Sequence, residues 1–400
     1  MIGLNCVTAA LSALLLSAGD GLAASPADIH AASVENTGRT VCDRDLKHAV
    51  ELYGRGLYAQ AESILDGLPE ECRTEESEGY RVLCSVCLGR EGYHAMMENY
   101  IERYPYSGLI PQMRFRHALN LFDAEDYAGA SAELEQLSRR QLYRRQVPEF
   151  LFRKAYCDLE NGLYDRALQR FDGVLARPVS DYTAPSQYFS GYILYQKERF
   201  TEAADRFVLS ARDPRFAEIS NYYILECRFM DKDYAYVTAH GPEMMPSVPE
   251  GRRPQLARLI SESFLVQGDA VQAREYFDMD VIPEEKKTRT DYFYAGSVLY
   301  AVKDWAGAAD NFSRMTDRTD SLGQIASYQM AFSYIQLKNK VAAMEAFREA
   351  SVPQYDPVIA EDAYYNYAKL AFDLNNDISG FDGYLAKYSD LKRGDRVYSY

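Results

Sequence analysis

One short pattern recurs along almost the whole chain: a turn, an aromatic residue, two variable residues, a small residue, three variable residues, then Phe or Leu. Its copies are GLYAQAESIL, EDYAGASAEL, GLYDRALQRF, ERFTEAADRF, GDAVQAREYF, KDWAGAADNF and NKVAAMEAFREA. The small-residue position recurs at intervals of 34 to 37 residues, at Ala61, Met96, Ala130, Ala167, Ala203, Val237, Ala273, Ala308 and Ala343. A repeat of this period predicts an array of helical hairpins, in which each unit packs against its neighbours rather than around one central core.

Each unit contains two segments of helical period separated by a glycine or a polar break, as the unit around Trp305 illustrates. Its apolar residues recur at i, i+3, i+4 and i+7, which places them on one stripe of each helix. We expect Gly296 and Ala308 to let the two helices approach closely while Phe312 fills the space beside them. Prolines follow the second helices, where they stop the helical period. They are Pro69, Pro105, Pro178, Pro214, Pro283 and Pro353.

Over residues 42–400 this pattern resembles the tetratricopeptide repeat family, whose unit is a helix–turn–helix with small residues at two facing positions and an aromatic residue beyond them. The resemblance implies an all-α fold, an α-solenoid in which about ten units form a right-handed superhelix over residues 41–400. It also implies that the first helix of each unit lines the concave surface. Two units depart from the pattern: the one centred on Val237, with Gly241 where Phe is expected, and the short tenth unit.

The order of segments towards the C-terminus also resembles long exported repeat proteins of Bacteroidota-type cell envelopes. In such proteins the segment KRGDRVYSY would open another repeat, whereas here the chain stops at Tyr400 without a polar capping helix. An uncapped apolar face is a liability in water. We therefore expect either a chain shorter than its relatives or an end that docks onto something, another copy included.

The N-terminal residues 1–24 are typical of a secretory signal peptide, with an apolar stretch from Leu4 to Ala18 and small residues before the expected cleavage. The segment lacks an early basic residue, since Arg39 is the first in the chain, so a membrane-anchoring or unstructured tail is the alternative. A flexible linker is expected over residues 25–40. No later segment approaches the length of a transmembrane helix. The protein is thus expected to be exported, to the periplasm or the periplasmic side of the outer membrane.

The chain has 44 Lys and Arg against 59 Asp and Glu, a formal charge of −15, which argues against a nucleic-acid partner. Six cysteines follow the predicted signal peptide, and export permits disulfides. Cys42 and Cys72 flank the first predicted hairpin and are expected to be able to form a bridge. Cys84 and Cys87 form a CxxC motif, which is typical of a redox pair or half a zinc site. Core packing is the favoured interpretation, because both fall on an apolar helical face.

An aromatic row is the main candidate for a binding site. The residue fifteen places before each small residue should face the concave groove, and it is aromatic in seven of eight units, with Arg258 the exception. Aromatic side chains give a large contact area at little entropic cost, so the row predicts a groove for a peptide or an amphipathic helix. Packing between helices is the competing explanation. The predicted groove residues are Phe115, Phe152, Tyr156, Tyr188, Tyr192, Tyr195, Tyr222, Phe293, Tyr300, Tyr328 and Tyr365.

Other chemistries find little support in the sequence. Arg116, Arg153 and Arg258 are isolated on first helices, so an adaptor that clamps carboxylates is disfavoured and these charges are expected to be solvated or paired inside the array. The five histidines show no metal or catalytic spacing, and phosphate-binding glycine motifs are missing. The sequence Asp373 to Ser379 resembles the opening of a calcium loop but lacks the required glycine and glutamate.

These observations predict a non-enzymatic scaffold without cofactor or metal, which binds a protein or peptide partner through its groove. The alternative is a self-assembling or outer-membrane-associated subunit of an envelope assembly or secretion complex that uses the uncapped C-terminal face.

Overall fold

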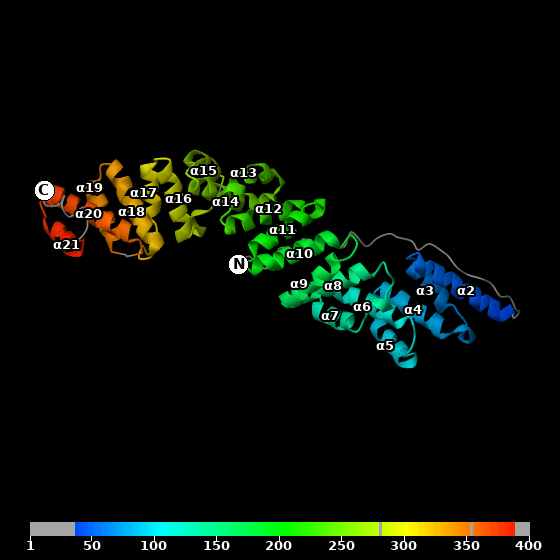
Figure 1. Cartoon of the computed structure of the whole chain (residues 1–400). Helices are drawn as coiled ribbons and strands as arrows, with labels where there is room; N and C mark the ends of the chain where they lie inside the picture. Colours follow the sequence, from blue (N-terminus) through cyan, green and yellow to red (C-terminus); the bar gives the residue numbers. More distant parts are fainter. Residues whose placement is uncertain (1–36, 280–281, 353–354, 389–400) are drawn as a thin grey trace. The chain divides into compact units, whose positions relative to one another are not determined.

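The computed structural model describes residues 37–279, 282–352 and 355–388, and in these residues it contains α-helices and short 3-10 helices without a β-strand (Figure 1). The predicted all-α fold is confirmed. The signal peptide expected at residues 1–24 lies outside the described residues. Helix α2 begins at Thr37, within the segment 25–40 that was expected to be a linker, and the final segment from residue 389 onward is also outside the description.

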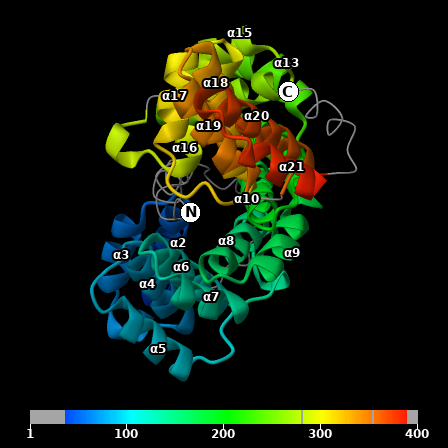
Figure 2. The same ribbon diagram turned by 90° about the vertical axis from the view of Figure 1, so that its left-hand side faces the viewer.

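The chain divides into two compact units, Met1–Ser220 and Asn221–Tyr400, each a stack of antiparallel helical hairpins in chain order (Figure 1 and Figure 2). The hairpins of the first unit are α2 (Thr37–Gly54) with α3 (Tyr58–Asp66), α4 (Glu75–Cys87) with α5 (Tyr93–Arg103), α6 (Ile110–Asp123) with α7 (Tyr127–Glu135), α8 (Val147–Glu160) with α9 (Tyr164–Leu175), and α10 (Thr183–Gln196) with α11 (Phe200–Ser210).

Helix α12 (Pro214–Met230) contains the boundary between the units. The second unit continues with α13 (Tyr234–Met244), then α14 (Arg253–Val266) with α15 (Ala270–Phe277), α16 (Arg289–Ala301) with α17 (Trp305–Ser313), α18 (Ser321–Gln336) with α19 (Lys340–Ser351), and α20 (Pro357–Asn375) with α21 (Ser379–Tyr388). Short 3-10 helices follow some second helices, at Glu70–Cys72, Arg139–Gln141, Met245–Ser247, Glu250–Arg252 and Glu284–Lys286.

The recurring small residues lie where the two helices of each hairpin cross. Eight of the nine are fully buried, and Met96, whose side chain is the longest, is half-buried. On the facing first helix of the α16–α17 hairpin, a Cβ atom added to Gly296 would lie 2.6 Å from the ring of Phe312. The predicted close approach of the two helices at Gly296 is thus confirmed, because only a residue without a side chain fits beside that ring.

The hairpin turns are uniform across the array. Ten residues with positive φ stand one in each turn between a first and a second helix: Gly56, Gly89, Glu125, Gly162, Glu198, Lys232, Gly268, Lys303, Lys338 and Asn376. In the first nine turns the next amide donates to the carbonyl five residues earlier, at 2.8 to 3.0 Å. This left-handed cap closes the first helix and sends the chain back antiparallel to it.

The departure predicted around Val237 has a packing cause. Helix α13 carries Gly241 where the repeated pattern has Phe or Leu, and a Cβ added there would lie 2.7 Å from a side-chain carbon of Ile260. Ile260 of α14 therefore occupies the space that a large side chain of the second helix fills elsewhere. The hairpin keeps its place in the array although its own aromatic residue is missing.

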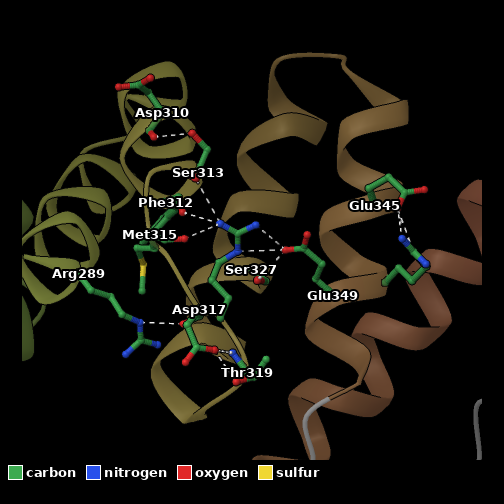
Figure 3. Close-up of polar contacts among 12 residues, drawn as sticks. Arg289, Asp310, Phe312, Ser313, Met315, Asp317, Thr319, Ser327, Glu345 and Glu349 are labelled. Atoms are coloured by element: carbon green, nitrogen blue, oxygen red, sulfur yellow. Dashed lines mark hydrogen bonds and ion pairs between the residues drawn. The ribbon is translucent and has the colours of Figure 1, made fainter.

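One connection between hairpins is tied down by an arginine. In the turn between α17 and α18, the Arg318 guanidinium donates to the carbonyls of Phe312 and Met315 and forms an ion pair with Glu349 of α19 at 2.9 Å (Figure 3). Arg318 thus satisfies carbonyl groups that the end of α17 leaves without an intrahelical partner. Figure 3 also shows Arg289 reaching the turn, where its Nε donates to the carbonyl of Asp317 at 2.9 Å.

Candidate partner-binding site

The structure corrects the predicted aromatic groove. Six of its eleven side chains are no more than 7% exposed and lie in the core between helices: Phe115, Phe152, Tyr156, Tyr188, Tyr192 and Tyr222. Phe152, for example, packs against the rings of Phe171, Tyr182 and Phe189 at centroid distances of 5.8, 5.3 and 6.2 Å. These rings fill space between successive hairpins, so they cannot line an open groove.

The other five predicted groove residues are half-buried: Tyr195, Phe293, Tyr300, Tyr328 and Tyr365. Most contact neighbouring side chains within their own unit. Tyr300 packs against Trp305 at 5.3 Å, and the Tyr328 hydroxyl donates to the Asp362 carboxylate at 2.6 Å. Helix-to-helix packing therefore accounts for most of the row, and a partner would reach at most the edges of these rings.

Two of the three first-helix arginines are neutralised by neighbours. Arg153 lies 3.2 Å from Asp123 and 3.4 Å from Glu149. Arg258 pairs with Glu262 at 2.8 Å and with Asp291, and its guanidinium lies 4.9 Å from the ring centroid of Tyr294. Both fit the expectation of charges paired inside the array.

Arg116 is different. It is half-buried on α6, its Nε is buried without a hydrogen-bond partner, and among the described residues it forms no ion pair within 4.0 Å. A desolvated cation without an anion is costly, since burial removes the water that would otherwise stabilise the charge. Of the three arginines, Arg116 is therefore the one without an ion pair among the described residues.

Three successive first helices build the surroundings of Arg116. Tyr53 near the end of α2, Tyr58 at the start of α3 and Cys87 at the end of α4 lie beside it, and α2 contacts α4 as α4 contacts α6. Both tyrosine hydroxyls influence the pKa of the Cys87 thiol, and the two rings lie 5.4 Å apart. We call these four residues, Tyr53, Tyr58, Cys87 and Arg116, the Arg116 site.

Electrostatics make the Arg116 site cationic at neutral pH. Burial raises the pKa of the Tyr53 phenol and of the Cys87 thiol, so both stay protonated while Arg116 keeps its charge. The hydroxyl, thiol and guanidinium groups can all donate hydrogen bonds, so the site suits a carboxylate rather than a cation. The sequence showed Arg116 but not its isolation, because part of the pairing of the other two arginines comes from Asp123 and Asp291 of neighbouring hairpins.

The remaining cysteines pack in the core. Cys84 stands twelve residues before Met96, at the facing position that alanine or glycine holds in hairpins such as that of Ala118 and Ala130. It is fully buried, and burial raises the pKa of its thiol to about 12. A protonated, buried thiol is a poor nucleophile, which agrees with the packing interpretation of the CxxC motif.

The structure pairs Cys42 with Cys72 as a disulfide, with Cα atoms 5.5 Å apart and a sequence separation of 30. The bridge ties α2 to the short 3-10 helix that follows α3. Its formation in the cell stays a prediction that rests on the predicted export.

Histidines and acidic residues show no catalytic arrangement in the described segments. His117 is buried and its Nδ1 lies 2.9 Å from the Tyr93 hydroxyl, while His94 lies 3.7 Å from Glu98. No group of three or more His, Cys, Asp or Glu in this part of the chain is placed to hold a metal ion. Tyr384, which stands where a calcium loop requires glutamate, is buried in the core. Among the described helices, none combines the length and the apolarity needed to cross a bilayer.

Comparison with known proteins yields solved structures only, because neither a family model nor a curated protein matches the chain. The C-terminal part of a repeat-containing protein from Cytophaga hutchinsonii is 17% identical, aligned over 66% of this chain and 98% of its own, with a TM-score of 0.37. The apo form of RapI is 14% identical over 78% and 96%, with a TM-score of 0.43. Yeast Sti1, as its TPR2AB domain in complex with pHSP90, is 14% identical over 66% and 100%, with a TM-score of 0.28.

Identities of this size concern the fold alone. The chain's own geometry carries the assignment: a period of 34 to 37 residues, small residues buried where paired helices cross, and a left-handed turn in each of ten hairpins. The chain therefore has the fold of a tetratricopeptide-type array of helical hairpins.

Proposed function

We propose that the protein is a non-enzymatic scaffold that binds a partner protein through the Arg116 site, with a carboxylate of the partner as the counter-ion of Arg116. The observation that carries this proposal is the half-buried guanidinium without an ion pair in the described residues. A carboxylate brought next to it would restore the compensation that Arg153 and Arg258 obtain from their own neighbours.

The donor groups of the site suit a carboxylate at the end of a chain or in an extended acidic segment. The donors come from α2, α3, α4 and α6, so they are held by packed helices rather than by loops. Rigid placement of donors favours binding, because little conformational freedom is lost when the partner arrives. Tyr53 and Tyr58 add aromatic surface beside the charge, and their side chains are half-buried rather than inaccessible.

The test is binding of a peptide library by the full chain, with each peptide present in a free-acid and an amidated C-terminal form. We expect free-acid peptides to be retained preferentially, and Arg116→Gln to remove that preference. Arg73→Gln is the matched control, since Arg73 is exposed and has no ion pair in the described residues. Equal retention by the parent and Arg116→Gln, with folding unchanged by circular dichroism, would refute the proposal.

We further propose export to the periplasm or to the periplasmic side of the outer membrane. The apolar N-terminal stretch supports this location. In an oxidising compartment the bridge between Cys42 and Cys72 would be preserved. N-terminal sequencing of the mature protein should begin near residue 25. An intact Met1 on protein recovered from the cytoplasm would contradict export.

Self-association is the second candidate function. Exposed apolar side chains gather around the connection from α19 to α20, where Val352, Tyr355 and Val358 are 73%, 62% and 75% exposed. Exposed apolar surface favours association. Light scattering over a dilution series should then show a mass that rises with concentration, and a mass that stays at one chain throughout would exclude this role.

A further inference from the structure

A dense basic segment interrupts this acidic chain in the connection between α7 and α8. It reads RRQLYRR over residues 139–145, four arginines in seven residues, in a protein of charge −15. All four arginine side chains are exposed, and among the described residues none of them has an ion-pair partner within 4.0 Å. We call this segment the arginine turn.

The acidic residues nearest in sequence are already engaged. Glu133 pairs with Arg114 at 2.9 Å, Glu135 pairs with Lys154 at 2.8 Å and with Arg170, and Glu149 pairs with Arg153. These three carboxylates therefore do not form ion pairs with the arginine turn, whose four arginine side chains are exposed to solvent.

The backbone of the arginine turn is held in place. The Ser138 amide and hydroxyl donate to the Gln141 side chain at 2.8 and 2.9 Å, and the Tyr143 amide donates to Gln146 at 3.0 Å. Gln146 in turn exchanges hydrogen bonds with Gln112 of the preceding hairpin at 3.2 and 2.9 Å.

Apolar side chains complete the anchoring. Leu137 and Leu142 point inward and are 6% and 8% exposed. Between the arginine pairs, the Tyr143 ring is 56% exposed, and the Arg145 guanidinium lies 5.9 Å from its centroid. The turn thus presents its cations on a preorganised platform, which lowers the entropic cost of binding.

We propose that the arginine turn is a second binding surface, which takes a short acidic segment of a protein partner. Guanidinium groups match carboxylates as planar forks, and paired arginines on either side of an exposed tyrosine provide the side-chain types enriched in protein interfaces. The arginine turn shares no residue with the Arg116 site, so its failure in a test would leave the proposed function standing.

Two other anionic partners fit less well. Proteins that bind nucleic acid usually contact its backbone with cations spread along one face. These four arginines lie within one turn, and the overall charge of the chain is −15. Binding to a bilayer surface would favour exposed apolar side chains that insert into it. Leu137 and Leu142 are buried, so Tyr143 is the exposed apolar side chain of the arginine turn. Carboxylates of one acidic segment match a cluster of this size.

The experiment measures binding of a fluorescein-labelled oligoglutamate peptide of about ten residues to the full chain, over a series of salt concentrations. Changing Arg139, Arg140, Arg144 and Arg145 together to Gln should weaken binding at least about tenfold. The matched control changes four exposed cations without ion pairs, Arg55, Arg73, Arg212 and Lys303, to Gln, and should stay within about twofold of the parent. Both variants remove the same charge, and circular dichroism checks their folding.

Replacing the four arginines of the turn by Lys should leave binding weaker than in the parent, because ammonium groups keep the charge but not the fork. A single-stranded oligothymidylate and vesicles containing phosphatidylglycerol serve as competing probes. Tighter binding of either probe with the same dependence on the turn would overturn the assignment to an acidic protein segment. Equal losses in the turn variant and the control, or no peptide binding at low salt, would overturn the site itself.

Discussion

At the scale of single residues, the array depends on a few positions where helices almost touch. Gly296 lies against the Phe312 ring, and Phe312 is fully buried. Glycine has a different effect in α9. A Cβ atom added to Gly173 would have no neighbour within 4 Å, so Gly173 only lowers the helix propensity. Identical substitutions at the two sites should therefore have opposite effects.

We expect Gly296→Ala to destabilise the protein by about 1–3 kcal/mol, because the new methyl group has to displace a packed ring. Gly173→Ala should stabilise it by about 0.5–1 kcal/mol, since alanine favours the helix without meeting a neighbour. Urea unfolding of both variants, followed by circular dichroism, measures the difference. Two changes of the same sign would show that the crossing at Gly296 is looser than described.

Single residues also decide which positive charges remain unpaired, as the Arg116 site and the arginine turn illustrate. Arg116, Arg153 and Arg258 all lie on first helices, and Arg153 and Arg258 each have an acidic residue four positions away on the same helix. Asp123 pairs with Arg153 and Asp291 with Arg258, in each case from a neighbouring hairpin. Function is therefore to be sought at the charges that remain unpaired after folding.

At the scale of elements, the hairpin turn is the unit that repeats most faithfully. Four of the ten left-handed positions are Gly, one is Asn, and five are Glu or Lys. A side chain in the left-handed region costs roughly 1–2 kcal/mol relative to the right-handed one. The turns at Glu198 and Lys303 are therefore tolerated because the paired helices impose the geometry.

Glu198→Gly and Lys303→Gly should each stabilise the protein by about 1 kcal/mol, after allowance for the greater freedom of glycine in the unfolded chain. Gly162→Ala is the complementary change, at a φ of +74°, and should cost about 1–2 kcal/mol. Thermal unfolding of the three variants provides the measurement. A stabilised Gly162→Ala would mean that the turn does not keep its left-handed conformation.

At the scale of the whole molecule, ion pairs between or beside helices recur in both units. Arg215 lies 2.8 Å from Asp213 in the first unit, and Arg314 lies 2.7 Å from Glu284 in the second. The hydrogen bond with Arg215 lowers the pKa of Asp213, and Arg289 does the same for Asp320. Hydrogen bonds from Lys287 and Tyr292 lower the pKa of Glu284 to about 2.

Acid should therefore destabilise the protein in a defined window. Because these carboxylates have a lower pKa folded than unfolded, the unfolded chain binds more protons below about pH 4.5, and stability falls as pH decreases towards about 2. Urea midpoints measured in steps from neutral pH to about pH 2.5 test this. Arg289→Gln should flatten part of the fall by raising the folded pKa of Asp320, and a midpoint independent of pH would contradict the ion pairs.

The sequence by itself determined the hairpins. The period, the facing small residues and the turn residues are local signals, each set by helical geometry or by the conformational freedom of one residue. They were sufficient to predict the all-α repeat array and the packing of Gly296 with Phe312. They also identified Cys42 and Cys72 as candidates for a bridge.

Only the tertiary structure decided which surfaces are open. The sequence predicted Phe152 and Tyr188 as groove residues from the helical face on which they lie. In the structure the next hairpin covers that face and buries both side chains. Arg116 differs from Arg153 and Arg258 in that it has no ion pair within 4.0 Å among the described residues. Burial and pairing depend on contacts between residues some thirty or more positions apart, and such contacts are not encoded in any local periodicity.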